Sequence, residues 1–496
     1  MPDVPTLGAD DVLAVPVGAG GVLPGWLTDS PVPPVSPELL AGALADTGNR
    51  GKPGNVTNVP IPGRRPRSVI AVGIGDAGLP DLRGYVGTAV RRAQQLAEFG
   101  ATRLVLALDS SVAPAGADEV RAAVETALLA GYRFRELSKP HPPRLQTVTV
   151  VAADDSVVAA ADAGRITAEA VAWARDLINT PSNVKNPGWL ADQARDRLSG
   201  QPHVTVTVLG EEELAAGGFG GVLAVGGGSA SPPRVVVVNY RHPDAGPDHP
   251  VLVGKGITFD TGGISIKPNA GMREMKTDMA GGAAVLATLD AVARFQLPIA
   301  VTAVVAAAEN AVSGSSYRPA DVVRHVGGRT TEVLNTDAEG RMVLADALAY
   351  ARLELGATAL VDVATLTGAM KVALGTRTAG LFATTDGLAD ALRTAAGHVG
   401  EPLWRMPLLE EHRDLLDSPV ADANNAPGNP GATTAALFLQ PFAGDLPWAH
   451  LDVAGPARAG SDDAELVKGG TGYGARTLLR WLEAGAPVDP SATVLD

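Results

Sequence analysis

Three short segments place charged side chains among glycine and apolar residues, where charge is least expected. They span 253–268, 275–282 and 335–341, and their charged residues of interest are Lys255, Asp260, Lys267, Asp278, Asp337, Glu339 and Arg341. An isolated ion in apolar surroundings costs several kcal/mol, so these groups must be paired or must hold ions. Two divalent cations would cancel the charge of the four carboxylates. Lys267 and Arg341 would then leave a positive surplus that suits an oxyanion or an anionic helper.

Each segment taken alone also fits a plainer interpretation, in which structural ion pairs and carboxylates at helix starts are stabilised by the helix dipole. Three such segments, each flanked by glycine that lets backbone approach closely, favour a site. Lys255 is expected to follow the end of a buried strand, where open α/β sheets place ligands. Asp337 and Glu339, two residues apart, are expected to point the same way along an extended segment and to reach one ion pair.

The composition narrows the chemistry further. The chain has no cysteine, which excludes disulfides, thiolate zinc sites and a cysteine nucleophile. Its 8 histidines form no H-x-H or H-E-x-x-H pair, so a metal site must rely on carboxylates and take hard or borderline divalent ions. The net charge of −14 argues against a general affinity for nucleic acid or anionic membranes.

Targeting features are not evident in the sequence. Residues 1–11 are acidic and lack the basic and apolar regions of a signal peptide. The most apolar stretch, 299–308, is too short to span a bilayer. We therefore expect a cytoplasmic protein.

The order of predicted elements indicates an α/β fold in two domains. The opening 60 residues are expected to be loop-like, followed by strands at 69–72, 103–108 and 147–152 and a helix at 87–99. A long Ala-rich helix at 157–178 is expected to connect the domains. We predict an N-terminal α/β domain at 1–165, a linking helix and turn at 166–185, and a larger C-terminal α/β domain at 186–496.

The second half has the stronger strand pattern. Its apolar runs do not alternate, as expected for central strands covered on both faces; they lie at 235–240, 251–253, 299–307 and 359–363. Helical patterns at 281–295 and 342–355 fill the intervals. The larger C-terminal domain is therefore expected to contain a central mixed, largely parallel sheet.

These segments resemble the leucyl aminopeptidase family, the cytosolic two-metal aminopeptidases. Residues 335–341 match the family's signature, with Met342 where leucine is usual. The agreement extends from about 175 to 474 and includes residues 309–310, 317–319, 364–368 and 448–454. Such long, ordered agreement is highly specific.

The resemblance implies a role for each matching position. Asp260 and Glu339 would bridge both metals, Lys255 (as a neutral amine) and Asp278 would complete the tighter site, and Asp337 would complete the more exchangeable one. Lys267 would polarise the scissile carbonyl, and Arg341 would hold a bicarbonate ion that relays a proton. Met275 and Ala454 would line the pocket for the first side chain, which implies a preference for leucine and other apolar residues.

The implied activity is release of N-terminal amino acids from peptides with a free amine, by water activated between two divalent ions, Mn²⁺ or Zn²⁺. The resemblance also implies a homohexamer. It further implies that the domain at 1–165 serves in assembly or regulation and that the domain at 186–496 is the catalytic metallopeptidase domain. Two other classes stay open: an inactive scaffold or DNA-binding regulator on the same fold, and a different two-metal hydrolase such as a phosphoesterase. Salt-dependent DNA binding would indicate the first. Turnover of phosphate esters, with indifference to a blocked substrate amine, would indicate the second.

Overall fold

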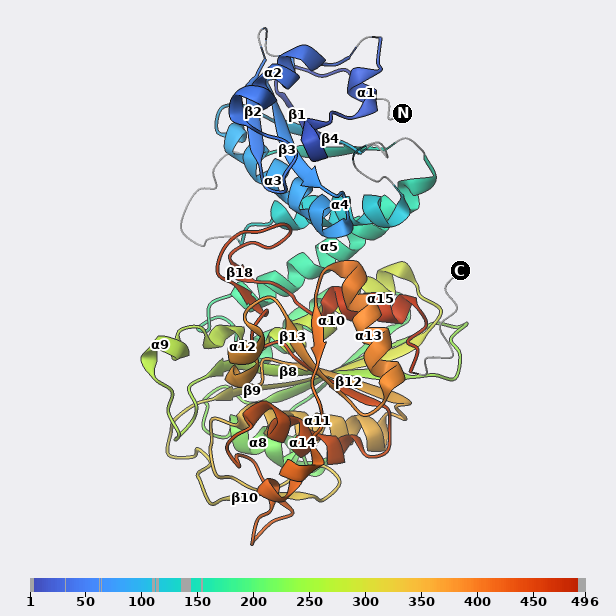
Figure 1. Ribbon diagram of the computed structural model, residues 1–496. Helices are drawn as coiled ribbons and strands as arrows, with labels where there is room; N and C mark the ends of the chain where they lie inside the picture. Colours follow the sequence, from blue (N-terminus) through green and yellow to red (C-terminus); the bar gives the residue numbers. More distant parts are fainter. Residues whose placement is uncertain are drawn as a thin grey trace. The chain divides into compact units, whose positions relative to one another are not determined.

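The chain forms two compact units. The computed structural model describes residues 4–488 except 32, 62, 64, 109–111, 113–115, 135–143 and 153–154. One unit contains Met1–Ala172 and Gly460–Lys468, and the other contains Trp173–Ala459 and Gly469–Asp496 (Figure 1). The finer domain limits expected from the sequence, with a separate linking segment at 166–185, stay a prediction.

The first unit is built on a five-stranded sheet of order β2-β3-β1-β4-β5, in which only the β2–β3 pair is antiparallel. Its strands are β1 (Asp11–Gly18), β2 (Val56–Pro60), β3 (Ser68–Gly75), β4 (Arg103–Ala107) and β5 (Thr147–Val151). The expectation of a loop-like opening segment was wrong, because β1 is the central strand. Pro16 obscures this strand in the sequence. It is tolerated because β4 pairs only with residues 11–14, so β1 has a single neighbour at Pro16.

Both faces of this sheet are covered. Alternate residues of β1 enter different cores: Val12 and Ala14 pack with α3 (Leu79–Ala97) and α4 (Ala117–Ala130). Leu13 and Val15 pack on the other face with the segment that holds α1 (Gly25–Thr28) and α2 (Pro37–Thr47). The helix predicted at 87–99 begins earlier, at Leu79, with Pro80 in its first turn. Helix α5 (Val158–Asn179) then runs from the first unit into the second.

The second unit contains an eight-stranded mixed sheet of order β14-β13-β16-β12-β8-β9-β7-β6. Four of its seven strand pairs are parallel, including the three central ones. Its strands are β6 (Val204–Leu209), β7 (Arg234–Arg241), β8 (Pro250–Asp260), β9 (Ala300–Asn310), β12 (Ala359–Ala364), β13 (Ala379–Ala383), β14 (Leu403–Arg405) and β16 (Trp448–Asp452). The two-domain α/β architecture and the largely parallel sheet predicted from the sequence are confirmed.

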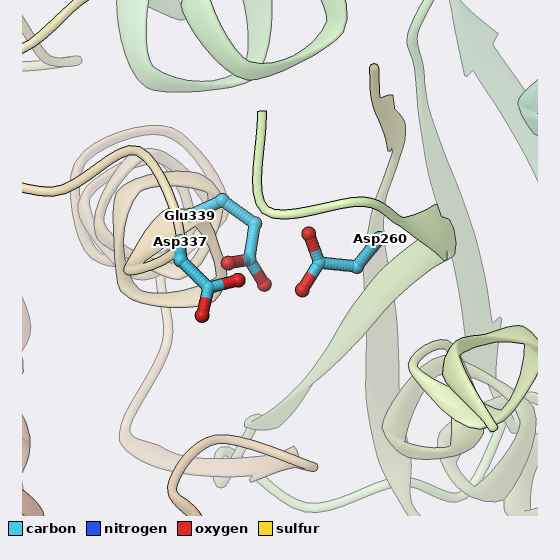
Figure 2. A group of neighbouring side chains, drawn as sticks. All are labelled: Asp260, Asp337 and Glu339. Atoms are coloured by element: carbon cyan, nitrogen blue, oxygen red, sulfur yellow. The ribbon is translucent and has the colours of Figure 1, made fainter. Parts of the chain in front are cut away.

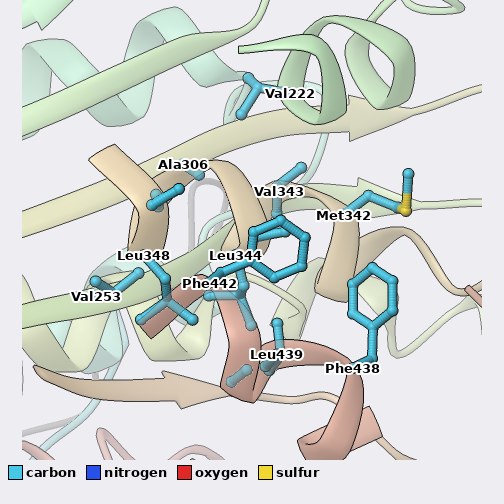
Figure 3. Packing of buried hydrophobic residues seen from close by; sticks show 14 of the residues in the cluster. Val222, Val253, Ala306, Met342, Val343, Leu344, Leu348, Phe438, Leu439 and Phe442 are labelled. Carbon is cyan, nitrogen blue, oxygen red and sulfur yellow. The ribbon is translucent and has the colours of Figure 1, made fainter. Parts of the chain in front are cut away.

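Helices cover both faces of the large sheet (Figure 1), which explains why its central strands lack alternation. The two layers contain α8 (Gly220–Gly226), α11 (Glu339–Glu354) and α14 (Gly431–Ala443) on one face, and α6 (Pro187–Leu198), α10 (Ala280–Phe295), α13 (Asp386–Val399) and α15 (Ala475–Glu483) on the other. The first layer encloses an apolar core in which Leu344, Leu348 and Phe442 pack over Val253 (Figure 3). No helix in the described part of the chain is long and apolar enough to cross a membrane.

Short elements complete the second unit. Its remaining strands are β10 (Val322–Arg324), β11 (Thr330–Glu332), β15 (Ala423–Asn424), β17 (Arg458–Ala459) and β18 (Gly469–Gly470). Its remaining helices are α7 (Glu211–Ala216), α9 (Asn269–Met272) and α12 (Gly368–Leu374), with 3-10 turns η3 (Met275–Thr277) and η4 (Glu410–Leu416). The first unit has comparable turns, η1 (Ala19–Gly21) and η2 (Asp155–Val157).

Helix α10 lies unusually close to the sheet, because its first turn contains two glycines. A Cβ at Gly281 would overlap the carbonyl oxygen of Val363 on β12, and one at Gly254 would lie 2.6 Å from the Cα of Gly282. The helix begins two residues after Asp278, so this close packing also fixes how near Asp278 lies to the strand ends.

We therefore expect Gly281→Ala to lower the free energy of unfolding by about 1–3 kcal/mol, because the added methyl group meets backbone that cannot rotate away. Chemical denaturation would measure the change. Gly271→Ala on α9 is the matched control, since a Cβ there would meet no atom within 4 Å. Equal stability of the two variants would contradict this account of the packing.

Candidate active site

Three carboxylates from two segments of the chain converge at the carboxyl edge of the large sheet (Figure 2). Asp260 is the last residue of β8, Asp337 lies in a turn, and Glu339 is the first residue of α11. Each offers an oxygen, and these oxygens all lie within 4.8 Å of one another. Asp260 and Glu339 are buried, whereas the Asp337 side chain is 31% exposed. Such a group of oxygen ligands suits a hard or borderline divalent cation.

The local structure differs from the sequence expectation at two points. Lys255 does not follow the end of a strand: β8 continues to Asp260, and Lys255 lies inside it, paired with Ala306. Asp337 and Glu339 do not lie on an extended segment, since the chain turns at Asp337 and enters α11 at Glu339. The turn and the helix start direct both carboxylates to one point, a geometry that the two-residue spacing does not reveal.

Two lysines lie between the carboxylates, and each forms ion pairs with two of them. Lys255 Nζ lies 2.8 Å from both Asp278 Oδ2 and Glu339 Oε1. Lys267 Nζ lies 2.8 Å from Asp260 Oδ2 and also contacts Asp337. Room for Lys255 depends on Gly340, where a Cβ would lie 2.6 Å from the lysine Cε. All four carboxylates predicted as ligands, and both lysines, are therefore brought together.

Neutral polar groups, which no sequence motif singled out, orient the carboxylates. The Asn310 side-chain amide and the Gly262 backbone N–H donate to Asp260 Oδ1 at 2.9 and 2.8 Å. The Thr365 hydroxyl donates to Asp278 Oδ1 at 2.7 Å. Asn310 ends β9, and Thr365 follows β12. The signal that could have identified them is position, because parallel neighbours of β8 end at the same edge of the sheet.

The cluster contains four carboxylates but only two lysines, so its positive charge does not balance its negative charge. Burial raises the pKa of Asp260 to about 6, and repulsion from Glu339 adds to this rise. Burial likewise raises the pKa of Asp278 well above its usual range. Burial also acts to lower the pKa of Lys255, but the attraction of Asp278, Glu339 and Asp260 outweighs it and the net shift is upward. Further cations are the chemistry that would relieve this imbalance.

Two buried carboxylate oxygens also indicate that the cluster lacks cations. Asp278 Oδ2 and Asp337 Oδ1 are each contacted by a lysine ammonium group, and each of these two groups is shared between two carboxylates. Two shared ammonium groups cannot occupy all the lone pairs of four carboxylates, and ligation of further cations would use the remaining ones. The residues therefore fit a divalent metal centre on their geometry and burial.

A pocket of about 390 Å³ opens beside the carboxylates. It is lined by Lys267, Asp337, Glu339 and Arg341, by the turn at 366–369, and by the loop at 426–429 with Gly431. Arg341 is buried, and its Nε and Nη1 have no hydrogen-bond partner among the described residues. Burial lowers the pKa of Arg341 to about 10, so the guanidinium stays charged at neutral pH. A buried cation with two free donors fits a planar anion.

The predicted specificity residues lie elsewhere. Met275 begins η3, and Ala454 follows β16, where its backbone N–H donates to Asp452 Oδ1 at 3.1 Å. In the part of the chain that the structure describes, neither residue lines this pocket. Their role in side-chain recognition stays a prediction.

Fold and site together define a metal-dependent hydrolase of the α/β class. Comparison with known proteins identifies its family. Residues 172–479 match the family described as "Cytosol aminopeptidase family, catalytic domain", and residues 35–140 match the corresponding N-terminal domain. A protein of Syntrophotalea carbinolica named "Probable cytosol aminopeptidase" is 43% identical over 479 residues, which cover 92% of this chain and 94% of the relative. One of the same name from Roseiflexus castenholzii is 45% identical over 435 residues, covering 85% and 87%.

A solved structure agrees over almost the whole chain. The bottromycin maturation enzyme BotP in complex with Mn is 38% identical, with a TM-score of 0.85, covering 97% of this chain and 100% of that one. The chain therefore belongs to the cytosol aminopeptidase family, as the sequence resemblance indicated. It is a metal-dependent exopeptidase, a hydrolase that acts on the amino end of peptides.

Proposed function

We propose that this protein releases N-terminal amino acids, leucine and other apolar residues preferentially, with two divalent cations bound at the carboxylate cluster. The observation that carries the proposal is the convergence of four carboxylates around two lysines at a strand edge. Mn²⁺ and Zn²⁺ both suit this mixed oxygen and nitrogen donor set. BotP, whose solved complex contains Mn, supports the first of the two.

The proposed ligands divide into a buried and a more exposed group. Asp260 and Glu339 would hold both ions, Lys255 and Asp278 would complete the buried, tighter site, and Asp337 would complete the exchangeable one. The exposure of the Asp337 side chain supports this division, since the Asp278 side chain is only 6% exposed. Lys255 would ligate as a neutral amine, because a cation in the cluster replaces the charge that now favours its ammonium form.

When bound, the two ions would activate a water molecule and accept the free α-amine of the substrate, which restricts cleavage to the first peptide bond. Lys267 donates to the scissile carbonyl oxygen as that oxygen gains negative charge. It is suited to this role because it lies between the carboxylates and the pocket, with its side chain 17% exposed. Met275 and Ala454 would favour apolar side chains.

Arg341 would hold a bicarbonate ion against its two free donors, in the pocket that it lines. The chemistry that bicarbonate supplies there is a base that moves a proton from the attacking water. Arg341 itself stays protonated and fixes the position of that base. The burial of the guanidinium and its lack of a hydrogen-bond partner on two nitrogens support this role.

We also propose a cytoplasmic homohexamer. Exposed apolar side chains of the second unit support self-association: Val372 is 89% exposed, and Ile266, Trp404 and Val420 are more than 60% exposed. Light scattering of the purified chain should give about six times the monomer mass. A monomer at micromolar concentration would contradict the assembly but not the activity.

The decisive experiment compares leucine p-nitroanilide with its N-acetylated form. We expect cleavage of the free-amine substrate alone, lost after chelation and restored by Mn²⁺ or Zn²⁺. Glutamate p-nitroanilide should be a poorer substrate than the leucine compound. Cleavage of the acetylated form, or of phosphate esters instead, would overturn the proposal and favour another two-metal hydrolase. Two bound ions with no hydrolysis would favour an inactive scaffold.

Arg341→Met should lower kcat by about 10²-fold or more with KM little changed, because the proton acceptor is lost and substrate contacts remain. Added bicarbonate should stimulate the wild type in carbonate-free buffer but not the variant. Arg393→Met, which removes an exposed arginine on α13, is the matched control. An identical bicarbonate response in wild type and Arg341→Met would disprove the role of Arg341.

A further inference from the structure

The turn that leads to Asp278 is fastened to the C-terminal end of α5. Lys185 Nζ donates to the backbone carbonyls of Leu177 at 3.0 Å, Ile178 at 2.9 Å and Lys276 at 2.5 Å. Lys276, in turn, donates from its own Nζ to the carbonyl of Asn179 at 2.9 Å. Lys185 thus donates to carbonyls of both α5 and η3, and Lys276 of η3 donates to the end of α5.

The lysine ammonium groups are chemically complementary to the carbonyl groups at the end of the helix. The last carbonyls of a helix have no partner within the helix and carry partial negative charge, which favours a cation nearby. Lys185 is fully buried, and three carbonyl acceptors match the three N–H donors of one ammonium group. Burial and the nearby Lys276 lower the pKa of Lys185, whereas the three carbonyls favour its ammonium form. Removal of the side chain is costly because it leaves three carbonyls without this donor.

The turn joined in this way carries part of the active site. The Asp278 backbone N–H donates to the Met275 carbonyl at 3.2 Å, so the side chain of Asp278 moves with the turn. Its carboxylate then meets Thr365 beyond β12 and Lys255 on β8. An ion pair between Glu274 and Arg458 of β17 holds the preceding residue. The distance from Asp278 to the other carboxylates therefore depends on where α5 holds the turn.

We propose that Lys185 and Lys276 are positioning residues that set the affinity of the tighter cation site by holding the segment 275–278 against α5. Neither lysine touches a carboxylate of the cluster in the described structure, so their effect passes through the backbone of the turn. Metal sites tolerate ligand displacements of only a few tenths of an ångström. The inference rests on the proposed function, in which Asp278 ligates one of two ions.

The test uses the full-length chain and four variants. Lys185→Met and Lys276→Met remove the donors with similar side-chain length, Lys276→Arg keeps a donor at a half-buried position, and Lys468→Met removes an exposed lysine as control. Calorimetric titration of chelator-treated protein with Mn²⁺ should show about 10-fold or more weaker binding of one ion in the two lysine-to-methionine variants. The other ion should bind as in the wild type. Lys276→Arg and Lys468→Met should bind both ions as the wild type does.

Activity measurements distinguish a role of the lysines in positioning the turn from a general loss of folded structure. At saturating Mn²⁺ the Lys276→Met variant should recover a kcat within a fewfold of wild type, because all ligands are still present. Wild-type affinity for both ions in Lys185→Met and Lys276→Met, with only a lower melting temperature, would overturn the inference and leave the proposed function intact. If Lys185→Met fails to fold, the comparison of Lys276→Met with Lys276→Arg decides alone. A wild type that binds no divalent ions would overturn the proposed function and this inference with it.

Discussion

Mutual repulsion among buried carboxylates is the constraint on which the catalytic unit depends. Two like charges 4.8 Å apart repel by about 3 kcal/mol at an effective dielectric constant of 20, and several such pairs occur here. Lys255 and Lys267 offset part of this cost, but burial, with repulsion from Glu339 as a smaller cause, keeps the pKa values of Asp260 and Asp278 raised. The protein keeps an arrangement that is unfavourable without further cations, which is the expected condition of a site built to bind them.

The fold holds these charges together with rigid elements. β8, β9 and β12 run parallel, so Asp260, Asn310 and Thr365 meet at one edge although they are far apart in sequence. Helix starts bring the remaining carboxylates, with α11 carrying Glu339 and α10 following Asp278. Glycines at the contacts let α10 approach the sheet and leave room for Lys255. Precise placement of like charges thus follows from backbone packing rather than from flexible loops.

Local signals in the sequence account for what could be predicted. Uninterrupted apolar runs identified the central strands. Charge among glycines indicated the seven charged residues that the structure brings to one edge of the sheet and its pocket, whose roles stay predictions. Pro16 concealed β1, and Lys255 with its flanking glycines interrupted the apolar run, which concealed the continuation of β8 to Asp260. Asn310 and Thr365 are neutral, so only knowledge of strand order makes them visible. Long-range pairing, such as residues 460–468 joining the first unit, has no periodic signature.

The two halves of the cluster differ in a way that bears on how the enzyme works. Around Lys255 the side chains of Asp278 and Glu339 are at most 6% exposed, and the turn before Asp278 is fastened to α5 by two lysines. Around Lys267, Asp337 is 31% exposed and faces the pocket that also contains Arg341. A buried site whose ligands are held in place exchanges its ion slowly. The ion on the Lys255 side would therefore remain bound for a long time. Substrate would then enter from the Lys267 side, where Lys267 and Arg341 line the same cavity.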